Sequence, residues 1–324
     1  MSIVDDLTPI NLLQEKEKFF ANQKYNPQFI YEKEIDKKTL TKYGLPEKKV
    51  SDLATAIVEK TYFGRNEQDL FMLEGARISQ QEASKKIKLF LNLHKLDKRF
   101  DVVWSSSFVS RAMMTSTTLR LRLPVDFHKE GLIGMIYHEI GTHALRRINY
   151  EQQPWYKKKK EFGFGEYLTT EEGLAVLHAL IPHSFKSAFI GAIRYIAVNY
   201  SQQHSFVEVW NFLSKYIQDL ERRWIVTIRT KRGIEDTATP GGFTKDLVYL
   251  DGLIRVSDWL KKNNFDPTPL YFGKLDIRDV GKAIQLNPNF QPQLPTFFTL
   301  DPLKYMTEIQ KIIEYNMLET THVF

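Results

Sequence analysis

The most constraining feature of this chain is a polar insert in an apolar segment, residues 134–143. It holds two histidines and a glutamate, His138, Glu139 and His143. The apolar residues that precede them are Leu132, Ile133, Met135 and Ile136. Burying polar groups costs free energy unless partners satisfy them, and one metal ion can satisfy two imidazoles. The pattern therefore predicts a buried helix that carries a metal site.

The spacing of the two histidines is unusual. They lie five positions apart, whereas the common zinc-protease helix, H-E-x-x-H, has them four apart. On an ideal α-helix, positions i and i+5 lie about 140° apart around the axis, so both rings cannot reach one ion. One extra residue carried as a π-bulge returns His143 to the face of His138, and such bulges occur mostly at functional sites. We expect this distortion between Glu139 and His143, where Gly141 makes it cheapest.

A catalytic zinc site needs a third protein ligand, and the next acidic candidate is Glu172, 29 residues after His143. It belongs to a second predicted helix, which Thr169 or Thr170 would cap and which would end near Pro182. Glu139 directly follows the first ligand, but its side chain should point in a different direction. That is where a general base for a metal-bound water is expected to lie. The sequence thus predicts one Zn²⁺ per chain, bound by His138, His143 and Glu172.

Two motifs carry a family resemblance. Residues 138–143 (HEIGTH) and 171–175 (EEGLA) resemble the microtubule-associated tyrosine carboxypeptidases and their bacterial relatives, the flavohemoglobin-expression-modulating QEGLA-motif proteins. Glu171 departs from the glutamine of the bacterial name, and the similarity continues in residues 229–233 and 241–250. The resemblance implies a zinc metallopeptidase that removes a C-terminal residue, which is tyrosine of tubulin in the animal members.

A carboxypeptidase also needs a cation for the terminal carboxylate and a donor for the developing oxyanion. The cluster of Arg229, Lys231 and Arg232 is the best source of the cation, and Lys245 comes next. Tyr249 is the candidate oxyanion donor. Arg111, Arg120 and Arg122 are alternatives. Each of these residues alone is more often an ion-paired or packed residue, so the cluster is the preferred hypothesis.

The charge and composition of the chain limit the kinds of partner and the compartment to expect. The net charge of +6 and the lysine run 157–160 favour an anionic partner. We expect an acidic peptide or protein C-terminal tail, tubulin-like by resemblance, rather than nucleic acid or a membrane, although four lysines are more often a solvated face. The chain has no cysteine, which excludes disulfides, thiolate metal sites and cysteine nucleophiles. With an N-terminus unlike a signal peptide, this predicts a cytoplasmic protein.

The predicted fold is α+β, predominantly helical and zincin-like, with a small antiparallel sheet before the zinc helix. Strand-forming residues in 99–123 predict the sheet, and its edge strand could pair with an extended peptide. Long helices are expected over residues 188–200, 206–229 and 243–262. We expect one metallopeptidase domain over 1–324, with an N-terminal arm and helix in 1–48. A proline-rich segment and a last helix fill 288–324.

Two other functions remain open. One is an aminopeptidase or dipeptidyl peptidase, since dipeptidyl peptidase III also uses an H-E-x-x-x-H helix. A free amine would need an acidic anchor, and the basic cluster favours a carboxylate instead. The other is a non-catalytic regulatory or binding protein that zinc stabilises. Glu139 argues against it, because a structural zinc site needs no base.

Overall fold

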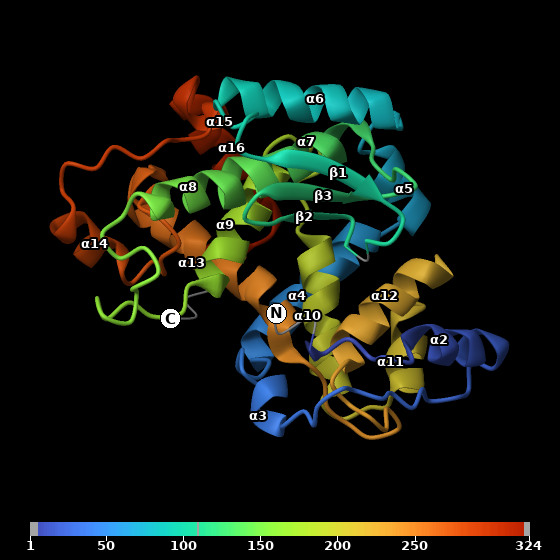
Figure 1. The fold of residues 1–324 in the computed structure, drawn as a ribbon. Coiled ribbons are helices and arrows are strands. Elements are labelled where there is room, and N and C mark those ends of the chain that lie inside the picture. The colour runs from blue at the N-terminus through green and yellow to red at the C-terminus, as the bar shows by residue number, and fades with distance from the viewer. Residues whose placement is uncertain (1–5, 109, 321–324) are drawn as a thin grey trace. The chain divides into compact units, whose positions relative to one another are not determined.

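The computed structural model describes residues 6–108 and 110–320, which form two compact units. Unit 1 comprises residues 6–67 and Ala188–Leu250, and unit 2 comprises Gln68–Ser187 and residues 251–320. Each unit is thus assembled from two segments that are far apart in the sequence (Figure 1). The expectation of one domain over the whole chain stays a prediction.

Unit 1 is built from helices that pack around aromatic side chains. They are α2 (Leu12–Ala21), α3 (Lys37–Leu40), α4 (Lys48–Tyr62), α10 (Phe189–Ser201), α11 (Phe206–Leu213), α12 (Leu220–Lys231) and the 3₁₀ turn η2 (Thr244–Asp246). Helix α4 packs along α10. The buried aromatic residues of one core cluster are Phe19, Phe29, Phe206, Trp210 and Trp224. Their large apolar area, removed from water, supplies much of the stability of this unit.

The prediction of one helix over residues 206–229 is wrong. Helix α11 ends at Leu213, and α12 begins at Leu220. Asp219 caps α12 by accepting a hydrogen bond from the backbone N–H of Arg222. An N-cap side chain satisfies backbone donors only at a helix start, so Asp219 begins a new helix inside an otherwise continuous apolar pattern.

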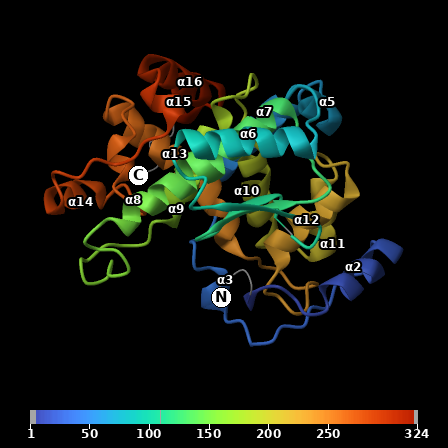
Figure 2. The same ribbon diagram turned by 45° about the horizontal axis from the view of Figure 1, so that its top comes forward.

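Unit 2 contains the sheet and the remaining helices. The helices before the C-terminal third are α5 (Glu67–Met72), α6 (Gln80–Leu93), α7 (Lys129–His138), the π-helix η1 (Glu139–Ala144), α8 (Leu145–Glu151) and α9 (Leu168–Leu180). The later ones are α13 (Leu247–Lys262), which starts in unit 1, η3 (Thr268–Tyr271), α14 (Val280–Leu286), α15 (Thr296–Thr299), α16 (Pro302–Tyr315) and η4 (Leu318–Thr320). Helices α6 and α7 run beside each other (Figures 1 and 2). No helix of the described ranges has the length and apolarity that a bilayer span requires.

The sheet is mixed, so the prediction of an antiparallel sheet is wrong for one of its two strand pairs. Its strands are β1 (Asp101–Ser105), β2 (Ala112–Met114) and β3 (Thr118–Arg122), in the order β1-β3-β2. A turn closed by the hydrogen bond from Thr115 N–H to Thr118 O makes β2 and β3 antiparallel. Strand β3 lies between β2 and β1 and runs parallel to β1. Strand propensity predicts strands but not which strands become neighbours.

Glycines let the helices of unit 2 approach closely. A Cβ atom on Gly134 of α7 would lie 2.6 Å from the carbonyl oxygen of Ala179 in α9. A Cβ on Gly173 of α9 would lie 2.1 Å from the carbonyl carbon of Gly252 in α13. Real Cβ atoms do not make such contacts, so only glycine permits these crossings. The first crossing places α9, and with it Glu172, against α7, and the second places α9 against α13.

Candidate metal centre

The predicted backbone distortion is confirmed. Helix α7 ends at His138, residues Glu139–Ala144 form a π-helix, and α8 follows without a break from Leu145. Side chains satisfy the backbone carbonyls at this distortion. The hydroxyl of Thr142 donates to Tyr137 O at 3.0 Å, and the hydroxyl of Tyr271 donates to Gly141 O at 2.6 Å. The ring of Phe297 leaves no room for a side chain at Gly141.

The π-helix brings the three predicted ligands together. The rings of His138 and His143 have their centroids 4.9 Å apart. Glu172 Oε2 lies 3.9 Å from His138 Nε2 and 3.8 Å from His143 Nε2. One ligand atom from each residue lies within 4.8 Å of the other two. Ligand atoms about 2.1 Å from a tetrahedral Zn²⁺ are about 3.4 Å apart, so the donor set and its spacing fit the ion.

Glu139 lies beside this cluster without belonging to it. One carboxylate oxygen, Oε2, accepts a 2.7 Å hydrogen bond from the backbone N–H of Met114, on edge strand β2. The other, Oε1, lies 4.0 Å from His138 Nε2. Burial raises the pKa of Glu139, His143 and the Met114 N–H oppose the rise, and the charge of Glu172 adds to it. A carboxylate with a raised pKa is a stronger proton acceptor, as a general base requires.

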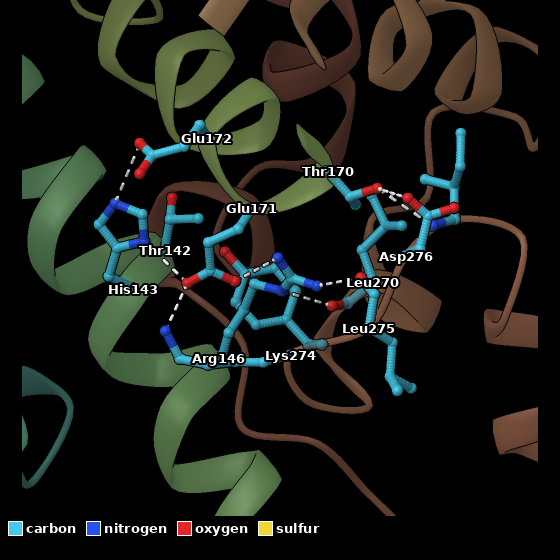
Figure 3. Close-up of polar contacts among 12 residues, drawn as sticks. Thr142, His143, Arg146, Thr170, Glu171, Glu172, Leu270, Lys274, Leu275 and Asp276 are labelled. Carbon is cyan, nitrogen blue, oxygen red and sulfur yellow. Dashed lines mark hydrogen bonds and ion pairs between the residues drawn. The ribbon is translucent and has the colours of Figure 1, made fainter. Parts of the chain in front are cut away.

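Sequence reasoning missed the role of Glu171. Its Oε1 lies 2.8 Å from Nδ1 of His143, on the side of the ring opposite Glu172 (Figure 3). Lys274 donates to Oε1 at 2.7 Å, and Arg146 donates to Oε2 at 2.5 Å. Burial alone would raise the pKa of Glu171, but Lys274, Arg146 and the bond with His143 hold it well below its ordinary value. The one sequence clue was a second acidic residue beside Glu172.

The predicted caps of α9 are wrong. The helix begins at Leu168, its N-cap is Tyr167, and the cap makes no side-chain hydrogen bond. Thr170 lies inside the first turn, where its hydroxyl bonds to Asp276 Oδ2 at 3.1 Å. The hydroxyl therefore bonds to a residue far away in the sequence and not to the backbone at the start of the helix.

His178 supports the π-helix from behind. The sequence favoured a packed histidine here, with a supporting role at the metal site as the alternative. The side chain is fully buried, with Nδ1 2.8 Å from Thr142 Oγ1 and Nε2 3.0 Å from Tyr305 Oη. Since Thr142 donates to Tyr137 O, His178 must donate through Nδ1–H and accept the Tyr305 hydroxyl at Nε2. Burial, together with the positive charge of Arg146, lowers the pKa of His178 to about 3.

This pKa predicts that acid destabilises the fold. An unfolded histidine titrates near 6.5, so below that pH the unfolded chain takes up a proton that folded His178 refuses until about pH 3. The free energy of unfolding should therefore fall by about 1.4 kcal/mol per pH unit for this one group. In metal-free protein, His178→Gln should flatten the dependence by that amount between pH 6 and pH 4.5, as measured by urea unfolding. The same change at His204 is the control, and equal slopes for wild type and His178→Gln would contradict the assignment.

The predicted carboxylate-binding cations belong to unit 1, whereas the three metal-ligand candidates belong to unit 2. Arg229 makes two hydrogen bonds to Asp246, at 2.9 and 2.5 Å. Burial disfavours its charge, but Asp246 more than compensates and raises the pKa of Arg229. Lys231 is fully buried and donates to three carbonyl oxygens at 2.8 Å each. These carbonyls belong to His204, Thr239 and Gly241.

Arg232 is engaged differently from its neighbours. Its side chain is buried over the ring of Phe243, and its Nε has no hydrogen-bond partner among the described residues. Burial and the nearby Arg229 lower its pKa to about 10. A buried guanidinium with an unused donor, such as that of Arg232, is the kind of group that an anionic ligand would stabilise.

Tyr249 is half-buried beneath the guanidinium of Arg194, which lies 5.3 Å from the centre of the tyrosine ring.

The remaining cations have varied surroundings. Lys245, the fourth predicted cation, is half-buried in the 3₁₀ turn η2. In unit 2, Arg111 and Arg120 stack on aromatic rings, and Arg122 lies in β3. In the lysine run only Lys159 is not exposed: its ammonium lies 3.4 Å from the ring centre of Tyr167, and burial lowers its pKa to about 7.

Comparisons with known proteins identify the family of this chain. A family model described as microtubule-associated tyrosine carboxypeptidase matches residues 12–314. The mouse microtubule-associated tyrosine carboxypeptidase 1 is 30% identical over 321 residues, which cover 97% of this chain and 68% of the relative. The human protein of that name is 29% identical over the same coverage. The mouse putative tyrosine carboxypeptidase MATCAP2 is 30% identical, over 98% of this chain and 62% of the relative. The chain therefore belongs to the microtubule-associated tyrosine carboxypeptidase family, a family of enzymes.

Proposed function

We propose that this chain is a zinc-dependent metallocarboxypeptidase with a zincin-like site, which removes the C-terminal residue of a peptide or protein tail. The observation that carries the proposal is the meeting of His138, His143 and Glu172 within 4.8 Å of one another, with Glu139 beside them. Family membership favours a carboxypeptidase over an aminopeptidase and over a non-catalytic zinc protein.

Each residue of the centre then has a role. His138, His143 and Glu172 would hold the zinc ion. When bound, zinc would polarise the scissile carbonyl and lower the pKa of a water molecule. Glu139 takes the proton of the attacking water and passes it to the leaving amine. The backbone N–H of Met114 fixes one oxygen of Glu139 and leaves the other available for this transfer.

The terminal carboxylate requires a cation, and the assignment to Arg229, Lys231, Arg232 and Lys245 is kept as a proposal. Arg232 is proposed as the direct contact because its Nε is an unused, buried donor. Arg229, held by Asp246, and Lys231, held by three carbonyls, would shape the cluster and add positive charge. Lys245 would add further charge, and Tyr249 is proposed to stabilise the oxyanion.

The substrate is proposed to be an acidic tail that ends in tyrosine. The relatives are named as tyrosine carboxypeptidases associated with microtubules, so a tubulin-like tail is a reasonable substrate for this chain. Its net charge of +6 and the exposed Lys157, Lys158 and Lys160 would attract such a tail.

Paired peptides that differ only at the C-terminus test the proposal. Wild type should shorten an acidic free-acid peptide by one residue, seen by mass spectrometry, and should spare its C-terminal amide. Arg232→Ala should lower kcat/KM on the free acid by about 10–100-fold, since hydrogen bonds to charged groups contribute about 1.5–3 kcal/mol. Arg65→Ala is the control, an exposed arginine of the same unit. Equal cleavage of acid and amide, or trimming from the N-terminus, would rule out the carboxypeptidase assignment.

A further inference from the structure

A histidine binds a metal ion well when one ring nitrogen is unprotonated and a hydrogen bond at the other nitrogen holds the ring in place. In His143, Nε2 faces Glu172 at 3.8 Å, and Nδ1 faces Glu171 at 2.8 Å. The oxygen of Glu171 also accepts from Lys274, so it acts as an acceptor and the shared hydrogen must sit on Nδ1. This contact places the hydrogen of the neutral ring on Nδ1 and leaves Nε2, which faces Glu172, as the nitrogen that can bind an ion.

Several buried groups hold Glu171 in place. The Glu171 carboxylate is 3% exposed and the Arg146 guanidinium is fully buried. Arg146 is itself fixed by two further hydrogen bonds, to Leu270 O and Leu275 O, both at 2.9 Å. Lys274 supplies a second positive charge to the same carboxylate. A buried charge is tolerable only when paired and hydrogen-bonded, and here each partner is.

One segment, the end of η3 together with the loop that follows it, provides most of these partners. Residues 270–276 contribute both carbonyls that hold Arg146, together with the ammonium of Lys274 (Figure 3). The loop is fastened to α9 next to Glu171, because Thr170 Oγ1 bonds to Asp276 Oδ2 and accepts from Ile277 N–H, both at 3.1 Å. A shift of this loop would therefore displace Glu171 and, through it, His143.

A carboxylate suits this position better than an amide. Oε1 receives hydrogen bonds from His143 and Lys274, and Oε2 receives one from Arg146. A glutamine would have to direct its NH₂ group at one of these donors, whichever way it turned. Only a carboxylate offers acceptors on both sides.

We propose that Glu171 is a positioning residue of the metal centre, which fixes the tautomer and the direction of His143, and that the 270–276 loop sets its placement through Arg146 and Lys274. The proposal rests on the zinc site proposed above. It differs from the ligand assignment in that Glu171 never touches the ion.

Zinc affinity measures this role without reference to activity. The dissociation constant is obtained by competition with a chromophoric chelator for wild type, Glu171→Gln, Glu171→Ala and Lys274→Met. Loss of such a supporting partner typically costs 10–100-fold in metal affinity, which we expect for both Glu171 variants. Lys274→Met should cost less, because Arg146 remains. Glu166→Gln, at an exposed glutamate before α9, is the matched control and should bind zinc as wild type does.

The tautomer of His143 separates positioning from mere stability. In metal-free protein labelled with ¹⁵N-histidine, at a pH high enough for the ring to be neutral, the side-chain nitrogen shifts of His143 should show one tautomer in wild type and a mixture in Glu171→Ala. A role in stability alone would lower the unfolding temperature and leave both the tautomer and the zinc affinity of the folded protein unchanged, and that outcome would overturn the proposal. Absence of zinc binding by wild type would overturn the proposed function instead, and the metal-free spectra would still decide the role of Glu171.

Discussion

Glu139→Gln is expected to lower kcat by about 10²–10⁴-fold while the protein keeps its zinc and its fold. Glutamine has nearly the same shape, and its carbonyl oxygen can still accept the hydrogen bond from Met114 N–H. It cannot accept a proton from water, so the chemical step alone should suffer. Turnover of the free-acid peptide, zinc content by elemental analysis and thermal unfolding together measure this separation.

The control for this variant is Glu166→Gln, which removes a negative charge at an exposed position of the same unit. It should leave turnover and zinc content unchanged. If Glu139→Gln retained the turnover of wild type, the base would have to be another residue. If it lost zinc, Glu139 would be supporting the ligands rather than serving as the base.

His138→Ala and His143→Ala are each expected to abolish stoichiometric zinc binding, and peptidase activity with it. Each variant leaves two of three protein ligands, and the cost in affinity should exceed the 10–100-fold attributed to a supporting partner such as Glu171. Bound zinc per chain after dialysis against a weak chelator provides the measurement. Glu172→Gln should behave like the histidine variants, because the amide carries no charge for the ion.

The matched control is His204→Ala, in unit 1. It should retain one zinc per chain. Full zinc occupancy in both His138→Ala and His143→Ala would remove the ligand assignment. Retention in only one of them would show that the ion has recruited another ligand.

Local patterns in the sequence predicted the core of the candidate site. The five-residue spacing of His138 and His143 forced the choice between no shared metal and a π-helix, and the π-helix is present. The apolar residues before His138 predicted a helix here, and α7 spans Lys129–His138. These features depend on residues within one or two helical turns, whose geometry is nearly the same in every protein.

The same local reasoning failed where distant residues compete for a group. Thr169 or Thr170 was expected to cap α9, but the hydroxyl of Thr170 bonds to Asp276, 106 positions away. The sheet became mixed because β3 inserts between β1 and β2, an order that strand propensity does not encode. Lys159 belongs to a run that was expected to be exposed, yet it packs against the ring of Tyr167.

The sequence by itself determined which residues could bind a metal ion, and that the helix between them had to be distorted. Only the tertiary structure decided what holds those residues in position. Glu171 meets Arg146 and Lys274 across 25 and 103 positions, and His178 meets Tyr305 across 127. The physical reason is that helix geometry is set by neighbouring backbone groups. The partner of a buried charge is whichever group the fold brings within hydrogen-bond distance, and no local pattern records that group.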